Sequence, residues 1–357
     1  MRCYVRLSVM QIPASPQELT ADWLASVLNG QGLGPDSIQS FEAELLGGEQ
    51  GMTGQLARLR IRYQDDRPGL PATLIAKFSA AEPAARAVIS ALGHYEREVR
   101  FYELLSSRTP VPTPHCYYSH LESETGFALL VLEDLARARN GNSIAGCSVD
   151  EVARVLVTLA RLHARWWQAV DLANASWLRL RSLLAPQAMV GAFSDAWPSF
   201  LQKLSIPVTS QISEMGDWIG QNLHAAATTL FESSPRTLIH NDVQADNLFF
   251  GEPDGEVIFI DWQMATYARC VIDVAGWVRG QLEPEVRRTA ESQLLRRYHD
   301  ALVANGVQDY ALEQCTADYQ LATVLAPARL ACAVGLSEGL HAHPGAFWDT
   351  LLPRYPD

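Results

Sequence analysis

The spacing of hydrophobic residues in the first third of the chain predicts a small region of mixed helix and sheet. Leu19, Trp23 and Val27 recur at helical spacing after Ser15, a residue type that often caps helices, and they predict a helix over residues 15–29. The pattern then changes to short extended segments separated by turns. These segments predict strands over residues 41–46, 56–63, 73–78, 116–120 and 127–133.

One long helix is expected between the third and the fourth of these strands. An apolar stripe at helical spacing runs from residue 84 to residue 105. Its members are Val88, Leu92, Tyr95, Val99 and Tyr102.

Helical spacing prevails in the rest of the chain, with one exception. Helices are expected over residues 149–170, 185–204, 211–231, 272–279 and most of 283–335. The exception is a pair of apolar runs at 248–250 and 257–260, which the turn-forming residues between them join into a predicted hairpin. The pattern therefore predicts an α+β protein with two lobes, a small β-sheet lobe with one main helix and a larger, mostly helical lobe.

The boundary between the lobes is expected at residues 134–146, where Arg, Asn and Gly are frequent. This boundary gives an N-terminal helical extension over residues 1–37, a first lobe over 38–134 and a second lobe over 135–357. A length of 357 residues suits two lobes, since a domain takes about 150 residues. Met10 is an alternative start of the native chain, because the regular pattern begins just after it.

Composition excludes several classes of protein. With 48% hydrophobic and 19% charged residues, the chain has the composition of a globular protein and not of a disordered or coiled-coil one. A formal net charge of −12 disfavours nucleic acid and anionic membranes as partners. The six cysteines form no CxxC pair, and no apolar run approaches the roughly 18 residues of a membrane span. We expect a cytoplasmic protein with reduced thiols.

The residues with the clearest chemistry flank the predicted hairpin. Asn247 precedes its first strand and Asp261 follows its second, so a hairpin brings the two side chains to the same open end. Asp242 lies five residues before Asn247 on the same loop. An amide oxygen and a carboxylate suit Mg²⁺, which prefers hard oxygen ligands, and a second carboxylate could orient or deprotonate a hydroxyl group. Turn-capping Asp and Asn residues beside an ordinary hairpin are the alternative.

The pattern HxDxxxxN, followed by a hydrophobic strand and an Asp, resembles the catalytic core of the protein-kinase-like superfamily. Within this superfamily, the sequences of the motifs are similar to those of the aminoglycoside phosphotransferase and choline kinase group. They are most similar to those of bacterial relatives of ecdysteroid kinases. The matching segments are His240-Asn241-Asp242, Ile260-Asp261-Trp262 and the hinge 130–135, LVLEDL. The resemblance implies Asp242 as catalytic base, Asn247 and Asp261 as magnesium ligands, and His240 as a residue that orders the loop.

The same resemblance implies a nucleotide site in the first lobe. Three glycines between two predicted strands, Gly48, Gly51 and Gly54, resemble a phosphate-covering loop, although a plain glycine turn is the alternative. Lys77 is a single cation in an apolar strand and needs a phosphate or a glutamate as partner. Periodicity leaves Glu96 and Glu98 open as that glutamate, and the family's ExxFY pattern selects Glu98.

Three further sets of residues match family elements. Backbone groups of the hinge strand from Val131 to Glu133 would bind an adenine edge. Asp273 matches a family DLA element, and we expect it to cap a helix. His163 matches the helix motif LAxLH, and we expect it to be structural.

The resemblance implies an ATP- and Mg²⁺-dependent kinase whose acceptor is a hydroxyl group of a small molecule. Asp273 follows Asp261 by only 12 residues, which leaves no long activation segment to hold a peptide. Eight tryptophans of the second half could form aromatic walls for a hydrophobic alcohol, an aminoglycoside or a choline-like acceptor, and the oligomeric state stays open. A regulatory nucleotide-binding module without catalysis is the alternative.

A hydrolase is a weaker hypothesis. Residues 335–339 read GLSEG and match the GxSxG nucleophile elbow, which needs a strand before it. The preceding segment 326–334 is predicted to be helical, so we do not favour this function.

Overall fold

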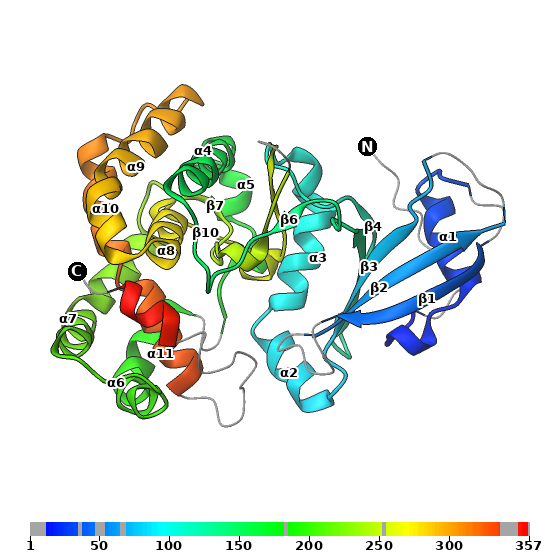
Figure 1. Ribbon diagram of the computed structural model, residues 1–357, viewed down its shortest axis with the longest axis horizontal. Helices are drawn as coiled ribbons and strands as arrows, with labels where there is room; N and C mark the ends of the chain where they lie inside the picture. The colour runs from blue at the N-terminus through cyan, green and yellow to red at the C-terminus, as the bar shows by residue number, and fades with distance from the viewer. Residues whose placement is uncertain are drawn as a thin grey trace. The chain divides into compact units, whose positions relative to one another are not determined.

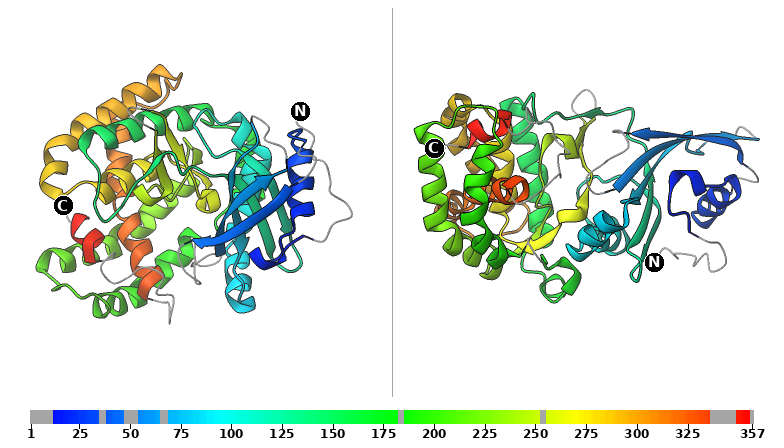
Figure 2. Two further views of the ribbon diagram at one scale, coloured as in Figure 1. Left: turned by 45° about the vertical axis from the view of Figure 1, so that its right-hand side comes forward. Right: turned by 90° about the horizontal axis from the view of Figure 1, so that it is seen from below.

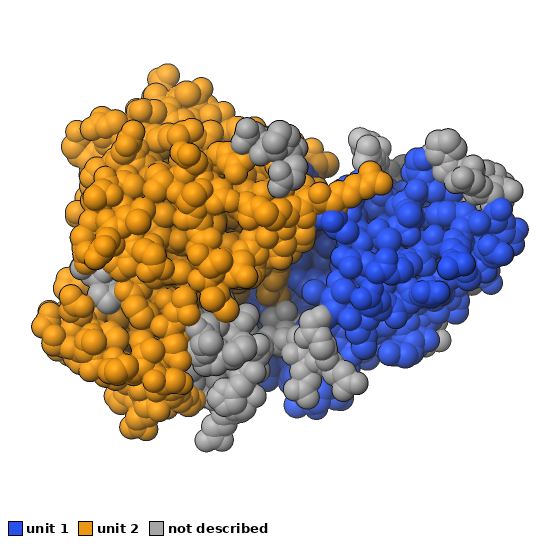
Figure 3. All heavy atoms as spheres, viewed as in Figure 1, with its two compact units in different colours: residues 1–106, 114–136 blue, residues 107–113, 137–357 orange. Residues whose placement is uncertain are grey.

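The computed structural model describes residues 12–34, 38–46, 54–64, 69–181, 185–251, 255–335 and 349–355. The chain divides into two compact units (Figure 3). Unit 1 comprises residues 1–106 and 114–136, and unit 2 comprises residues 107–113 and 137–357. The α+β fold class is confirmed, with a small antiparallel sheet in the N-terminal part and a mostly helical C-terminal part.

Unit 1 is built on a five-stranded antiparallel sheet whose strand order is β1-β2-β3-β5-β4. The strands are β1 (Ile38–Leu46), β2 (Gly54–Tyr63), β3 (Thr73–Ser79), β4 (Cys116–Glu122) and β5 (Phe127–Glu133). Helix α1 (Ala21–Gly30) packs on one face of this sheet, and α3 (His94–Leu104) lies on the other (Figures 1 and 2). Leu74, Ala76 and Phe78 of β3 are buried with α1, so the alternation of a strand turns Lys77 towards the face of α3.

The N-terminal extension is part of unit 1, because Trp23 and Leu28 of α1 belong to the same hydrophobic core as the sheet. Its helix begins later than expected. Ser15 precedes only the short 3₁₀ helix Pro16–Glu18 and makes no side-chain cap bond. The N-cap of α1 is Thr20, whose hydroxyl accepts a hydrogen bond from the N–H of Trp23 at 3.1 Å.

The prediction of a single helix over residues 84–105 is wrong. The structure has two helices, α2 (Pro83–Ala91) and α3, separated at Gly93, whose φ is +78°. Glycine adopts this left-handed conformation at little cost and so ends the first helix. The apolar stripe does not survive the break intact, because Val88 is 54% exposed.

Unit 2 is mostly helical, and its β structure is confined to short strands near one loop. Its helices are α4 (Val149–Arg165), α5 (Val170–Ala173), α6 (Pro186–Gln202), α7 (Ser210–Glu232), α8 (Val271–Gln281), α9 (Pro284–Ala304), α10 (Leu312–Ala322) and α11 (Leu325–Gly335). The predicted hairpin is formed by β8 (Leu248–Phe250) and β9 (Val257–Phe259). The pattern missed β6 (Arg139–Asn140), which pairs with β8, and the pair β7 (Thr237–Ile239) and β10 (Thr266–Ala268).

Buried aromatic residues form much of the core of unit 2. Trp166, Trp262 and Trp277 are at most 1% exposed, so these three tryptophans are structural. Within the described ranges, no helix is long and apolar enough to cross a membrane. The cysteines at 116, 147, 270, 315 and 332 are free thiols.

Candidate active site

The β8–β9 hairpin brings Asn247 and Asp261 to one end, as its geometry predicts. Leu248 pairs with Phe259, and just beyond this pair the N–H of Ile260 donates to the carbonyl of Asn247 at 3.0 Å. Asp261 is the next residue after Ile260. A one-residue shift in the hairpin register would separate the two side chains.

Asp242 is tied to the same point by the side chain of Asn247. The amide nitrogen Nδ2 of Asn247 donates to the backbone carbonyl of Asp242 at 2.9 Å and to its carboxylate Oδ2 at 3.0 Å. These two bonds use the nitrogen end of the amide, so they do not occupy the oxygen Oδ1 of Asn247. The structure thus brings Asp242, Asn247 and Asp261 together.

Electrostatics at this cluster favour a cation. Burial first, and then the negative charge of Asp261, raise the pKa of Asp242 to about 6. Asp261 has φ +61°, a left-handed conformation that non-glycine residues rarely adopt, and its carboxylate accepts a bond from Gln263 at 3.2 Å. Two repelling carboxylates with an amide oxygen beside them fit Mg²⁺, whose coordination shell phosphate and water usually complete. Among the described residues, no group of three His, Cys, Asp or Glu side chains could hold a metal ion.

His240 orders the loop of residues 240–247, which we call the HND loop. Its side chain is fully buried, and Nε2 donates to the carbonyl of Ile260 at 2.9 Å, because a carbonyl can only accept. This bond ties the start of the HND loop to the strand end that carries Asp261. This geometry fits the loop-ordering role expected for His240, which stays a prediction.

In unit 1 the structure pairs Lys77 with Glu98, as the ExxFY pattern selected. Lys77 Nζ lies 2.8 Å from the carboxylate of Glu98, which is 97% buried and lies on α3. A buried carboxylate needs such a partner, so the pair fixes the ammonium group on the α3 face of the sheet.

The other predicted nucleotide contacts stay predictions. Gly48 and Gly51 lie outside the described residues. A Cβ atom at Gly54 would lie 2.0 Å from the carbonyl oxygen of Phe78, so strand packing alone requires a glycine there. Val131 pairs with β3 and β4 inside the sheet, and the N–H of Glu133 donates to the carbonyl of His115 at 2.8 Å.

A comparison with family models identifies the wider relationship. The model of the ecdysteroid kinase-like family matches residues 48–308, which is more than half of the chain. The chain belongs to the ecdysteroid kinase-like family. No curated protein matches this family member significantly by sequence.

Solved structures support the kinase-like fold of this ecdysteroid kinase-like protein. A protein from Ralstonia eutropha assigned as an aminoglycoside phosphotransferase has a TM-score of 0.54 and 16% identity, over 92% of this chain and 96% of that one. Choline kinase from Cryptosporidium parvum has a TM-score of 0.55 and 9% identity, over 91% and 92% of the two chains. An aminoglycoside 2′-phosphotransferase variant in complex with GDP has a TM-score of 0.50 and 13% identity, over 88% and 92%. At these identities the likeness establishes the fold alone.

The interpretation of Asp273 as a helix cap is wrong. The N-cap position of α8 belongs to Cys270, and the carboxylate of Asp273 instead accepts bonds from the backbone N–H groups of His240 at 2.8 Å and Asn241 at 2.7 Å. His163, buried as expected, adds a contact from Nε2 at 3.2 Å. Two backbone bonds to one buried carboxylate hold the first residues of the HND loop against α8.

Arg329 on α11 is a residue of the site that the sequence analysis missed. Its Nη1 donates to the carbonyl of Asn241 at 3.3 Å, and its guanidinium group lies over the ring of Phe231. Burial lowers the pKa of Arg329 to about 10, and its positive charge in turn lowers the pKa of Asp242. The sequence alone does not indicate that this positive charge lies next to the HND loop. Arg329 is an ordinary arginine in a predicted helix, where arginines commonly face solvent.

Proposed function

We propose that this protein is an ATP-dependent phosphotransferase that moves the γ-phosphate of ATP to a hydroxyl group of a small molecule. The observation that carries the proposal is the cluster of Asp242 and Asn247, on a loop whose backbone is held by Asp273, with Asp261 at the adjacent end of the hairpin. Membership of a kinase-like phosphotransferase family supports it.

In this proposal each residue of the cluster has one task. Asn247 and Asp261 would hold Mg²⁺, which neutralises charge on the transferred phosphate when it is bound. The carboxylate of Asp242 accepts the proton of the acceptor hydroxyl as its oxygen forms a bond to the γ-phosphorus. The bond from that phosphorus to the bridging oxygen breaks, and ADP leaves. Lys77, held by Glu98, binds phosphate oxygens.

The acceptor class follows from the short connection after Asp261. Only a 3₁₀ turn and β10 separate Asp261 from α8, which leaves little chain to hold a peptide. A hydrophobic alcohol, an aminoglycoside or a choline-like compound therefore remains the set to screen. The name of the ecdysteroid kinase-like family favours a hydrophobic alcohol. The names of the fold neighbours favour an aminoglycoside or a choline-like compound.

The remaining partner assignments stay part of the proposal. The net charge of −12 supports no nucleic-acid or membrane partner, and free thiols suit the cytoplasm.

The GxSxG segment supports no hydrolase, because Gly335 ends the helix α11 and no strand leads into it. The alternative is a kinase-like regulatory module that binds nucleotide without transfer.

A thermal-shift titration with ATP and Mg²⁺ tests the nucleotide and metal sites. A ligand that binds only the folded state adds RT ln(1 + [L]/Kd) to the free energy of unfolding and so raises the melting temperature. We expect a Mg²⁺-dependent rise with ATP for the wild type and a much smaller one for Asp261→Asn. No rise with ATP or GTP for the wild type would contradict the proposal.

A further inference from the structure

Residues 139–147, which we call the strap, cross the end of the HND loop in unit 2. Through β6 the strap pairs with β8, where Asn140 lies opposite Phe249. The N–H of Gly141 donates to the carbonyl of Leu248 at 2.9 Å. A Cβ atom at Gly141 would lie 2.3 Å from the carbonyl oxygen of Ala245, so the strap lies directly against the loop backbone.

Asn140 holds the carbonyl groups of the two residues that flank Asn247 in the chain. Its Nδ2 donates to the carbonyl of Asp246 at 3.0 Å and to that of Leu248 at 2.9 Å. Because the carbonyl of Asn247 itself is bonded to Ile260, the backbone of Asn247 is fixed on three sides. A fixed backbone limits the directions in which the Asn247 side chain can point.

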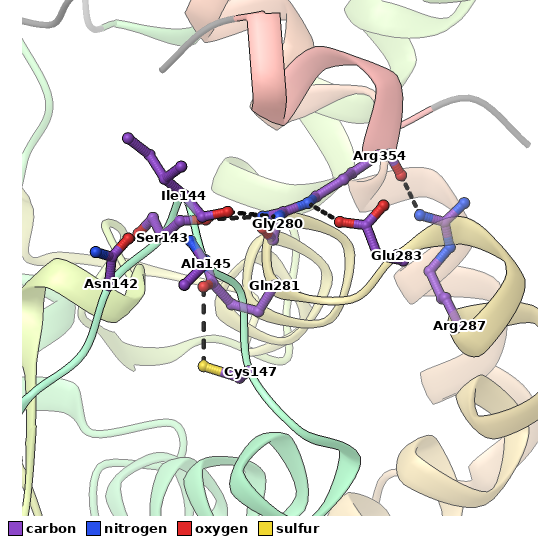
Figure 4. Close-up of polar contacts among 10 residues, drawn as sticks. All are labelled: Asn142, Ser143, Ile144, Ala145, Cys147, Gly280, Gln281, Glu283, Arg287 and Arg354. Atoms are coloured by element: carbon purple, nitrogen blue, oxygen red, sulfur yellow. Dashed lines mark hydrogen bonds and ion pairs between the residues drawn. The ribbon is translucent and has the colours of Figure 1, made fainter. Parts of the chain in front are cut away.

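The other half of the strap is fastened by Arg354, from the C-terminal segment 349–355. Arg354 is 2% exposed and donates to the carbonyls of Ser143 at 2.8 Å, Ile144 at 3.0 Å and Gly280 at 2.9 Å (Figure 4). Its Nε also donates to Glu283 at 2.9 Å. The guanidinium group thereby joins the strap to the end of α8 and the start of α9.

The two halves of the strap are connected at Ser143. While its carbonyl accepts a bond from Arg354, its N–H donates to the carboxylate of Asp246 at 3.3 Å. Asp246 is the neighbour of Asn247 in the HND loop. Helix α8 therefore holds both ends of this loop, the first through Asp273 and the second through Arg354 and the strap.

We propose that Asn140 and Arg354 are positioning residues for Asn247, and that the strap and the C-terminal segment set the affinity of the metal site. This inference rests on the proposed function, in which Asn247 is a magnesium ligand. Residues that orient a metal ligand typically change metal affinity by 10- to 100-fold when they are replaced. Asn140 acts directly on the loop, and Arg354 acts through Ser143 and Asp246.

The test is a Mg²⁺ titration of the melting temperature at a fixed concentration of a non-hydrolysable ATP analogue. We expect Asn140→Ala to raise the half-saturating Mg²⁺ concentration about tenfold and Arg354→Gln to raise it several-fold. The matched controls are Asn142→Ala, an exposed strap residue whose side chain accepts a bond from the N–H of Ala145 within the strap, and Arg296→Gln, an exposed arginine on α9. Both controls should stay within twofold of the wild type.

Two further variants make every outcome decisive. Arg354→Lys keeps the charge and part of the bonding, so it should recover part of the affinity, and it serves with Asn140→Ala if Arg354→Gln fails to fold. If Asp261→Asn keeps the Mg²⁺ dependence, the proposed function fails. If Asp261→Asn loses it while Asn140→Ala and the Arg354 variants match the controls, the proposed function stands and the positioning inference is wrong.

Discussion

Replacing Asp242 with asparagine is expected to stabilise the protein in the absence of metal and nucleotide, although it removes the proposed catalytic base. Burial and the charge of Asp261 raise the pKa of Asp242 from 3.8 to about 6. The folded state therefore keeps this proton to a higher pH than the unfolded chain does. Stability contributed by the protonated form is present below about pH 4 and is lost as the pH rises through about 6.

The size of the effect follows from the same shift in pKa. A difference of about two pH units corresponds to about 3 kcal/mol of unfolding free energy. Because the side chain of Asp242 is only partly buried and solvent screens its charge, we expect Asp242→Asn to recover about 1–2 kcal/mol at pH 8. At pH 5 about half of this gain should remain. The replacement amide oxygen can still accept the bond from Asn247.

Differential scanning calorimetry in the presence of EDTA measures this difference. A gain of 1–2 kcal/mol should raise the melting temperature of unit 2 by about 3 °C at pH 8. The exposed Asp300 on α9 supplies a control, and Asp300→Asn should leave the melting temperature nearly unchanged. A variant at Asp242 that is less stable than the wild type at pH 8, or a gain of equal size at both pH values, would refute the reasoning.

Three other replacements test separate parts of the site. Lys77→Met removes the ammonium group that pairs with the buried Glu98 and should cost about 3 kcal/mol in urea unfolding, whereas Lys77→Met combined with Glu98→Leu should regain stability without regaining the ATP-dependent thermal shift. Asp273→Asn loses a buried carboxylate that accepts two backbone bonds and should cost about 2–4 kcal/mol by the same measurement; an unchanged midpoint would show that these bonds do not hold the loop. Arg329→Met removes a charge that lowers the pKa of Asp242, so the acidic limb of the rate–pH profile should move to higher pH by about half a unit or more, while Arg329→Lys should leave it in place.

The part of the site that the sequence predicts is the part built from neighbours in the chain. The turn residues between β8 and β9 predict the hairpin, and the hairpin alone brings Asn247 and Asp261 to one end. Lys77 stands out because it interrupts an apolar strand, which demands a partner. The prediction that this partner is Glu98 and not Glu96 needed the family pattern, since both glutamates lie beside the apolar stripe.

The contacts that hold the HND loop could not be predicted in this way. Asp273 accepts bonds from backbone N–H groups, and Asn140 and Arg354 donate bonds to backbone carbonyls. The two residues joined by each of these bonds are 32 to 211 positions apart in the chain. Every residue offers the same backbone groups, so such bonds leave no matching pair of side chains in the sequence. The break at Gly93 was hidden for a different reason, because the apolar period continues across it.

The most direct test of the central claim is a phosphoryl-transfer assay with Mg²⁺ and γ-labelled ATP, run in parallel on a hydrophobic alcohol, an aminoglycoside and choline. The account predicts a labelled phosphate ester with at least one acceptor class for the wild type. It also predicts no measurable product for Asp242→Asn, which should still bind ATP because Asp242 serves the acceptor hydroxyl. A wild type that binds Mg²⁺ and ATP yet transfers phosphate to none of the three classes, or a variant at Asp242 that transfers at the wild-type rate, would contradict the account.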